Sequence, residues 1–371
     1  MTLPLLTRLP SVALAAALTL TACQQKPGYT PESSNKSSSL GTTGYLQPFE
    51  TGIRTGGVQV IPIKTPKGTF NVWTKRFGTG KIKVLLLHGG PAMTHEYMEC
   101  FESFFPQEGI EFYEYDQLGS YYSDQPQDDD LWRTERFVDE VEQVRQALGI
   151  DKFYVLGHSW GGILALEYAL KHQDHLAGLV ISNMVASIPR YDAYNKTLRA
   201  KLRPTLLDSL EKFEARKDYH NPTYEGLVFK NYYSRHLLRL PAMPDPVVRS
   251  FKHVNQHVYE LMQGPNEFKT AGRLLTWDRW NDLGKVTVPT LMIGGQFDTM
   301  NPKEMEEMSH RVQQGNYLLC PQGSHMSMWT TSKSTSAASP SSSSPSTMVL
   351  SEQALLCNYP AARPDRLWCF R

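Results

Sequence analysis

Along the chain, segments whose apolar positions have the pattern of a strand alternate with segments whose apolar positions have the pattern of a helix. Alternation of apolar and polar residues over 58–63 and 70–77 predicts a half-exposed hairpin, and a nearly continuous apolar run at 82–87 predicts a central parallel strand. Further strands are expected at 110–115, 152–156, 176–182, 289–294 and 316–320, and helices at 94–105, 134–148, 161–171 and 303–313. This order predicts an α/β fold with a mostly parallel, doubly wound sheet covered by helices on both faces.

The strand and helix alternation stops between residues 186 and 285. This stretch is polar, aromatic and helix-prone, and it contains several prolines. It predicts an inserted helical cap that divides the core into a first part, 51–185, and a second part, 286–329.

The first 50 residues do not fit a folded core. One positive charge at Arg8 precedes an apolar run at 11–20 that is too short to span a bilayer, as in a secretory signal. The run closes on LTAC at 20–23, which resembles the lipobox of bacterial lipoproteins, so 1–23 is expected to be a signal with Cys23 lipidated. An ordinary signal with an incidental cysteine is the alternative. The stretch 24–50 is rich in Ser, Thr, Gly and Pro and predicts a flexible tether. We therefore expect a protein of the bacterial cell envelope, periplasmic or on the outer surface, that contacts the membrane through the lipid anchor only.

The last segment, 330–371, begins as a Ser- and Thr-rich stretch and continues without a clear period. Its composition predicts a low-complexity, disordered tail. A frameshift or a misread gene end would produce such a sequence.

The charge and the cysteine content of the chain limit which ligands and partners we expect. Lys and Arg number 38 against 37 Asp and Glu, so no basic excess indicates nucleic acid, and a small-molecule partner is expected. The five cysteines form no CxxC pair and no metal-ligand spacing, so neither a metal nor a cofactor is expected. Cys100 and Cys320 are expected to be buried apolar side chains and not a bridge.

The sequence GHSWG at 157–161 is the strongest chemical signal. An apolar strand precedes it and a helix of small residues follows, which is the strand-turn-helix setting of a nucleophile elbow. A serine that only caps the helix is the structural alternative. We interpret Ser159 as the nucleophile of an α/β-hydrolase fold with an inserted cap.

A serine nucleophile needs a general base and a residue that orients the base. In this fold the acid and then the histidine follow the serine, each in a loop after a strand. Asp298 follows the strand at 289–294, and His325 follows the strand at 316–320. Glu304 and Asp282 are less suitable candidates for the acid, because Glu304 lies in the next helix and Asp282 precedes the strand.

The tetrahedral intermediate also needs N–H donors for its oxyanion. The sequence HGGP at 88–91 follows the strand at 82–87, where this fold keeps one donor. We assign the donors to the backbone N–H groups of Gly90 and Trp160.

Seven motifs together resemble the proline iminopeptidase family of serine aminopeptidases. They are HGGP (88–91), YDQLG (115–119), GHSWGG (157–162), MQGPNEF (262–268), WD (277–278), FD (297–298) and GSH (323–325). The resemblance implies that Glu267 of the cap binds the α-amino group of the substrate beside an apolar pocket for the proline ring. A desolvated ammonium does need a carboxylate partner.

The chain differs from the family pattern at three places. Ala92 stands where HGGPG is common, Thr299 stands where many members carry a second glutamate after the aspartate, and serine-rich sequence follows Trp329 where the family has a final helix.

The expected function is release of N-terminal residues, preferably proline, from short peptides or amino-acid amides through an acyl-enzyme. Two alternatives remain open. One is an esterase or amidase of the same fold without amine recognition. The other is a non-catalytic envelope protein that retains the fold.

Overall fold

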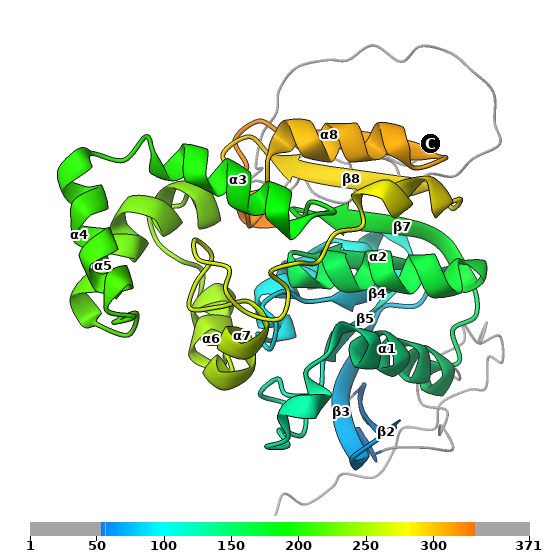
Figure 1. Cartoon of the computed structure of the whole chain (residues 1–371). Coiled ribbons are helices and arrows are strands. Elements are labelled where there is room, and N and C mark those ends of the chain that lie inside the picture. Colours follow the sequence, from blue (N-terminus) through cyan, green and yellow to red (C-terminus); the bar gives the residue numbers. More distant parts are fainter. Residues whose placement is uncertain (1–52, 56, 331–371) are drawn as a thin grey trace, which may run out of the picture. The chain divides into compact units, whose positions relative to one another are not determined.

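The apolar runs predicted as strands lie side by side in one sheet in the computed structural model, which describes residues 53–55 and 57–330 (Figure 1). Within these residues the sheet has nine strands: β1 (Ile53–Thr55), β2 (Val58–Thr65), β3 (Gly68–Phe77), β4 (Ile82–Leu87), β5 (Ile110–Asp116), β6 (Phe153–His158), β7 (Leu176–Ser182), β8 (Thr290–Gly295) and β9 (Gly315–Cys320). Their order is β1-β2-β3-β5-β4-β6-β7-β8-β9. The first three strands pair in antiparallel fashion, β3 pairs antiparallel with β5, and all pairs from β5 to β9 are parallel.

Both faces of the central strands are buried, as a continuous apolar run requires. Leu85 and Leu87 of β4 belong to one apolar cluster, and Val84 and Leu86 belong to another on the opposite face. The first cluster includes residues of α1 (Thr134–Leu148), α2 (Trp160–His172) and α8 (Pro302–Arg311), and the second includes residues of η1 (His95–Ser103). The predicted α/β fold with a mostly parallel sheet is therefore confirmed.

A helical cap lies between β7 and β8 in the chain, at the left of Figure 1. Its elements are α3 (Ile188–Arg199), α4 (Pro204–Ala215), α5 (Pro222–Val228), the π-helix η5 (Phe229–Leu237), α6 (Asp245–Lys252) and α7 (Gln256–Met262). The 3₁₀ helix η6 (Trp280–Lys285) precedes β8 and contributes Trp280 and Leu283 to the apolar cluster of the core. The cap has an apolar cluster of its own, which includes Leu210, Tyr224 and Phe268. It therefore has side-chain packing that does not depend on the sheet alone.

One local prediction needs correction, and one strand was not predicted. The helix expected at 94–105 is a 3₁₀ helix, η1, and a further 3₁₀ turn, η2 (Phe105–Glu108), follows it. Six of the nine η1 residues are buried, so packing against the sheet and not an amphipathic α-period decides how this short connector winds. The short strand β1 was not predicted. Further 3₁₀ turns are η3 (Asp129–Leu131) and η4 (Gln173–His175).

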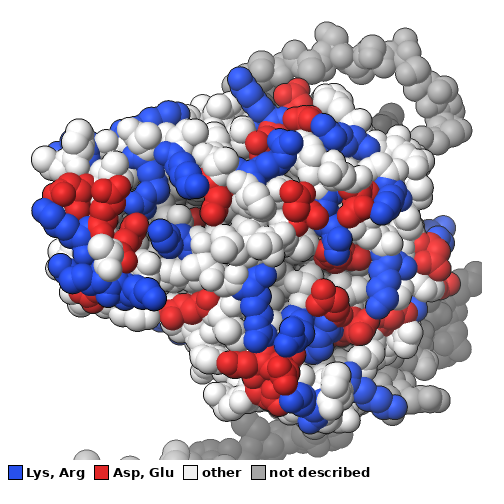
Figure 2. Space-filling model, viewed as in Figure 1, with Lys and Arg blue, Asp and Glu red and all other residues white. Residues whose placement is uncertain are grey.

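Cys100 and Cys320 are free and buried, as expected. Among the helices of the described residues, none combines the length and the apolar character that crossing a bilayer requires. Figure 2 shows Lys and Arg interspersed with Asp and Glu over the visible face. The predicted signal, tether and Cys23 lie outside the described residues, which end with α9 (Ser327–Thr330) at the start of the predicted tail.

Candidate active site

Ser159 occupies a sharp turn between β6 and α2. Its backbone has φ 56° and ψ −125°, a conformation that residues other than glycine rarely adopt. A Cβ on Gly157 would lie 2.0 Å from the carbonyl oxygen of Gly161, and a Cβ on Gly161 would lie 1.9 Å from that of Leu87. Only glycine fits at either position, so the GxSxG spacing follows from the packing of this turn.

His325 and Asp298 meet at the carboxyl ends of β9 and β8. Nδ1 of His325 lies 2.9 Å from Oδ1 of Asp298, and both side chains are buried. Burial alone would raise the pKa of Asp298, but the His325 ring and its hydrogen bond hold the pKa below its ordinary value. Burial would lower the pKa of His325, whereas the Asp298 charge outweighs burial and raises it. The pair therefore favours the charged forms of both residues.

Asn183, which sequence reasoning did not single out, holds the other side of the acid. Its Nδ2 donates to Oδ2 of Asp298 at 2.7 Å and to the carbonyl of Ser324 at 3.0 Å. The backbone N–H of Met300 donates to Oδ1 at 3.1 Å. Thr299 is buried and its hydroxyl lies 3.3 Å from the same oxygen, so it contacts Asp298 and is not among the residues that line the cavity.

The two predicted oxyanion donors border the serine. Trp160 is the first residue of α2, where a backbone N–H has no acceptor within its own helix. Gly90 has φ 114° and lines the cavity beside Ser159. Ala92 adopts φ 58°, a conformation that favours glycine, which explains why glycine suits this loop position.

A chain of buried hydrogen bonds connects the oxyanion loop to the base. The N–H of Gly89 donates to Oη of Tyr97 at 2.6 Å, Oη lies 2.9 Å from Nδ1 of His158, and Nε2 of His158 lies 2.8 Å from the carbonyl oxygen of His325. A carbonyl can only accept, so Nε2 carries the proton and Nδ1 accepts from the tyrosine. Burial lowers the pKa of His158 to about 3, so the ring stays neutral and keeps this tautomer.

The cap contacts the catalytic loops directly through η5. The N–H of His325 donates to the carbonyl of His236 at 2.8 Å, and the N–H of Met326 donates to that of Leu237 at 2.9 Å. Nδ1 of His236 lies 2.7 Å from the carbonyl of Phe297, in the loop of the acid. The cap therefore holds the loops of both the base and the acid.

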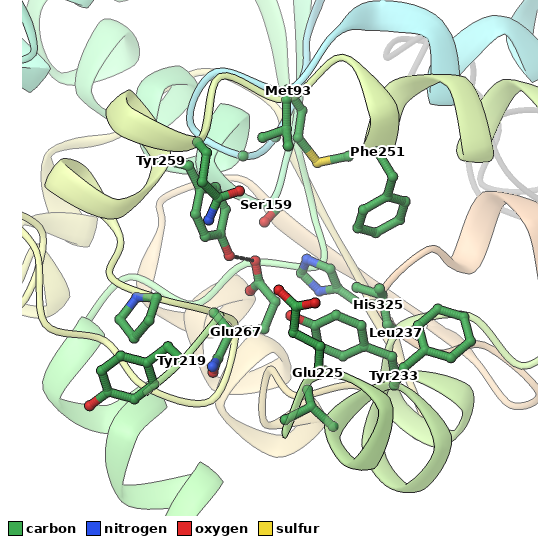
Figure 3. A pocket seen from close by; sticks show the side chains of 18 of the residues that line it. Met93, Ser159, Tyr219, Glu225, Tyr233, Leu237, Phe251, Tyr259, Glu267 and His325 are labelled. Atoms are coloured by element: carbon green, nitrogen blue, oxygen red, sulfur yellow. Dashed lines mark hydrogen bonds between the residues drawn. The ribbon is translucent and has the colours of Figure 1, made fainter. Parts of the chain in front are cut away.

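Ser159, His325 and Glu267 line one cavity of about 510 Å³ between core and cap (Figure 3). The hydroxyl of Tyr259 donates to Oε1 of Glu267 at 2.6 Å, and that of Tyr191 donates to the Glu267 carbonyl. Aromatic and aliphatic residues, including Tyr233 and Phe251, form much of the wall. The structure thus brings the predicted catalytic, oxyanion and amine-binding residues together.

Cys23 lies outside the described residues, so its predicted lipidation stays a prediction. Within the part of the chain that the structure describes, no group of three or more His, Cys, Asp or Glu is placed to hold a metal ion.

Comparisons with known proteins agree with this geometry. The family model for the alpha/beta hydrolase fold matches residues 83–331. The chain is 61% identical over 274 residues to a proline iminopeptidase of Flavobacterium johnsoniae, covering 73% of this chain and 92% of the relative. It is 62% identical over 275 residues to one of Elizabethkingia meningoseptica, with the same coverage. The solved proline iminopeptidase of Mycobacterium smegmatis superposes with a TM-score of 0.66 at 29% identity, covering 73% of this chain and 92% of that one.

The elbow, the triad order and the sheet topology define a serine hydrolase of the α/β-hydrolase fold. Within that class the chain belongs to the proline iminopeptidase family, and it is a serine aminopeptidase.

The hydrogen-bond chain through His158 predicts different effects for two amide substitutions. Glutamine places its amide nitrogen near the position of Nε2 and keeps the bond to the His325 carbonyl, whereas asparagine reaches only the position of Nδ1. We expect His158→Asn to lower kcat by roughly five- to tenfold, the equivalent of one hydrogen bond, with KM unchanged. His158→Gln should retain most of kcat.

Melting temperatures measured in parallel separate positioning from stability. If both variants lose kcat equally, or if the loss follows the melting temperature, then His158 only fills space in the core.

Proposed function

We propose that the enzyme releases N-terminal proline from short peptides and amino-acid amides. The observation that carries this proposal is a carboxylate, Glu267, in the same cavity as the nucleophile. A substrate ammonium that enters this enclosed space needs an anionic partner, and Glu267 provides one while Tyr259 fixes its orientation. The apolar wall suits a proline ring. The names of the relatives support the same substrate.

The reaction divides into two acyl transfers. Oγ of Ser159 attacks the carbonyl carbon of the first residue while His325 takes the hydroxyl proton, and the N–H groups of Gly90 and Trp160 stabilise the oxyanion. Asp298 stabilises the imidazolium that forms. His325 then gives the proton to the leaving amine, which departs and leaves the prolyl ester of Ser159. Water attacks this ester with His325 as base, and the free amino acid leaves.

Glu267→Gln should separate amine recognition from acyl transfer. The amide keeps the shape of the side chain but leaves the incoming ammonium unpaired, which costs about 2 to 5 kcal/mol for such a charge pair. We expect kcat/KM for a proline arylamide to fall by roughly thirtyfold to several thousandfold. An aryl ester without an amine should change only a few-fold.

The aryl ester is the internal control, because Ser159 and His325 act on both substrates. Equal loss on both would mean that Glu267 only holds the cap together, and it would favour an esterase without amine recognition.

We also propose that the protein is lipid-anchored in the cell envelope. The support is the sequence LTAC at 20–23 after an apolar run. A single lipidated cysteine adds buried methylene groups that favour the membrane.

Cys23→Ser removes the acceptor of the lipid, so the variant should move from the membrane fraction to the soluble fraction. Fractionation beside the unsubstituted protein measures this, and a variant that still sediments with membranes would show that Cys23 is incidental.

A further inference from the structure

The catalytic cavity runs from a buried end to an exposed mouth. Ser159 and His325 are 7% and 3% exposed, whereas Phe229, which lines the same cavity, is 50% exposed. Pro222, Glu225 and Gly226 of α5 are also exposed and line the same cavity. The mouth is therefore built by α5, the start of η5, His220 and the first residue of α7, Gln256.

The cavity carries negative charge at two separate places. Glu267 and Glu225 both line it, and neither Lys nor Arg is among its described lining residues. Tyr233 lines the same cavity, and the charges of Glu267 and Glu225 add to burial, the main cause, in raising the pKa of its hydroxyl. Figure 3 shows both carboxylates reaching into the cavity near this ring.

The two carboxylates differ in their partners. Glu267 accepts a hydrogen bond from Tyr259, whereas the carboxylate of Glu225 makes no hydrogen bond or ion pair with the described residues. His220, also at the mouth, has Nε2 3.0 Å from Oε1 of Glu260 and is therefore already paired. Glu225 is left as an uncompensated charge at the mouth.

We propose that Glu225 selects the residue that follows the scissile bond and favours peptides with a basic residue there. This inference rests on the proposed function, in which the N-terminal residue occupies the buried end with its amine on Glu267. The rest of the peptide must then extend past α5 toward solvent. A cationic side chain is attracted by Glu225, and an acidic side chain or the free carboxylate of a dipeptide is repelled.

Four substrates and two variants test the proposal. The substrates are Pro-Lys-amide, Pro-Gln-amide, Pro-Glu-amide and an uncharged proline arylamide, and kcat/KM is measured for each. Glu225→Gln removes the charge and keeps the size of the side chain. Glu211→Gln, at an exposed position of α4 that does not line the cavity, is the matched control.

We expect the unsubstituted enzyme to prefer the Lys over the Gln peptide, and the Gln over the Glu peptide, by roughly three- to tenfold at each step, as for a partly screened charge pair. In Glu225→Gln the three values should converge to within about twofold, and the arylamide should change less than the Lys peptide. Glu211→Gln should keep the full preference. About 1 M salt should also remove the preference in the unsubstituted enzyme, because the Debye length falls to about 3 Å.

Two results would overturn this proposal while leaving the proposed function intact. One is the absence of a charge preference in the unsubstituted enzyme. The other is an equal loss on all four substrates in Glu225→Gln, which would mean that Glu225 shares the substrate amine or holds the cap. Failure of the proposed function is visible separately, as an unsubstituted enzyme that hydrolyses an aryl ester but not the proline arylamide, and that result would overturn both.

Discussion

Asp298 is completely buried beside the ring of His325, and the catalytic site is built around this pair. A carboxylate taken out of water loses several kcal/mol of solvation unless donors replace the water. Here His325, Asn183 and the Met300 N–H supply them. Because these donors follow β9, β7 and β8, one buried charge holds the loops at the ends of three neighbouring strands together.

The cap takes part in the same construction. Carbonyl groups of η5 accept hydrogen bonds from the N–H groups of His325 and Met326. The ring of His236 contacts the loop that carries Asp298. The same helix carries Phe229 and Tyr233, which line the cavity. The lining of the cavity and the hydrogen bonds to the His325 loop therefore depend on one π-helix, a feature that is frequent at functional sites. Changes in η5 should accordingly alter kcat and KM together.

The sequence predicted those elements whose structure depends on residues near to one another in the chain. The apolar run of β4, the helix α1 and the elbow at Ser159 each follow from periodicity or from a turn that only glycine permits, and the order of motifs placed Asp298 and His325. The contacts that complete the site are not local. Asn183 reaches Asp298 across 115 residues, and His158 reaches the His325 carbonyl across 167.

The roles of some residues could not be predicted from the sequence. Tyr97 lies in a short 3₁₀ helix whose winding is set by packing, and its role depends on a hydroxyl that meets Gly89 and His158 only in the folded chain. Glu225 is one exposed glutamate among many in the sequence. Only the position of α5 at the mouth of the cavity distinguishes it.

The pH dependence of Ser159 phosphonylation by a small fluorophosphonate tests the central pair most directly, because this reaction needs the base and no amine recognition. His325 must be neutral to accept the serine proton, and Asp298 raises its pKa above the ordinary 6.5. The rate should therefore fall on the acid side with an apparent pKa above 6.5. In Asp298→Asn this limb should move to lower pH, with a much slower rate at every pH. An apparent pKa that is the same in both proteins would contradict the account.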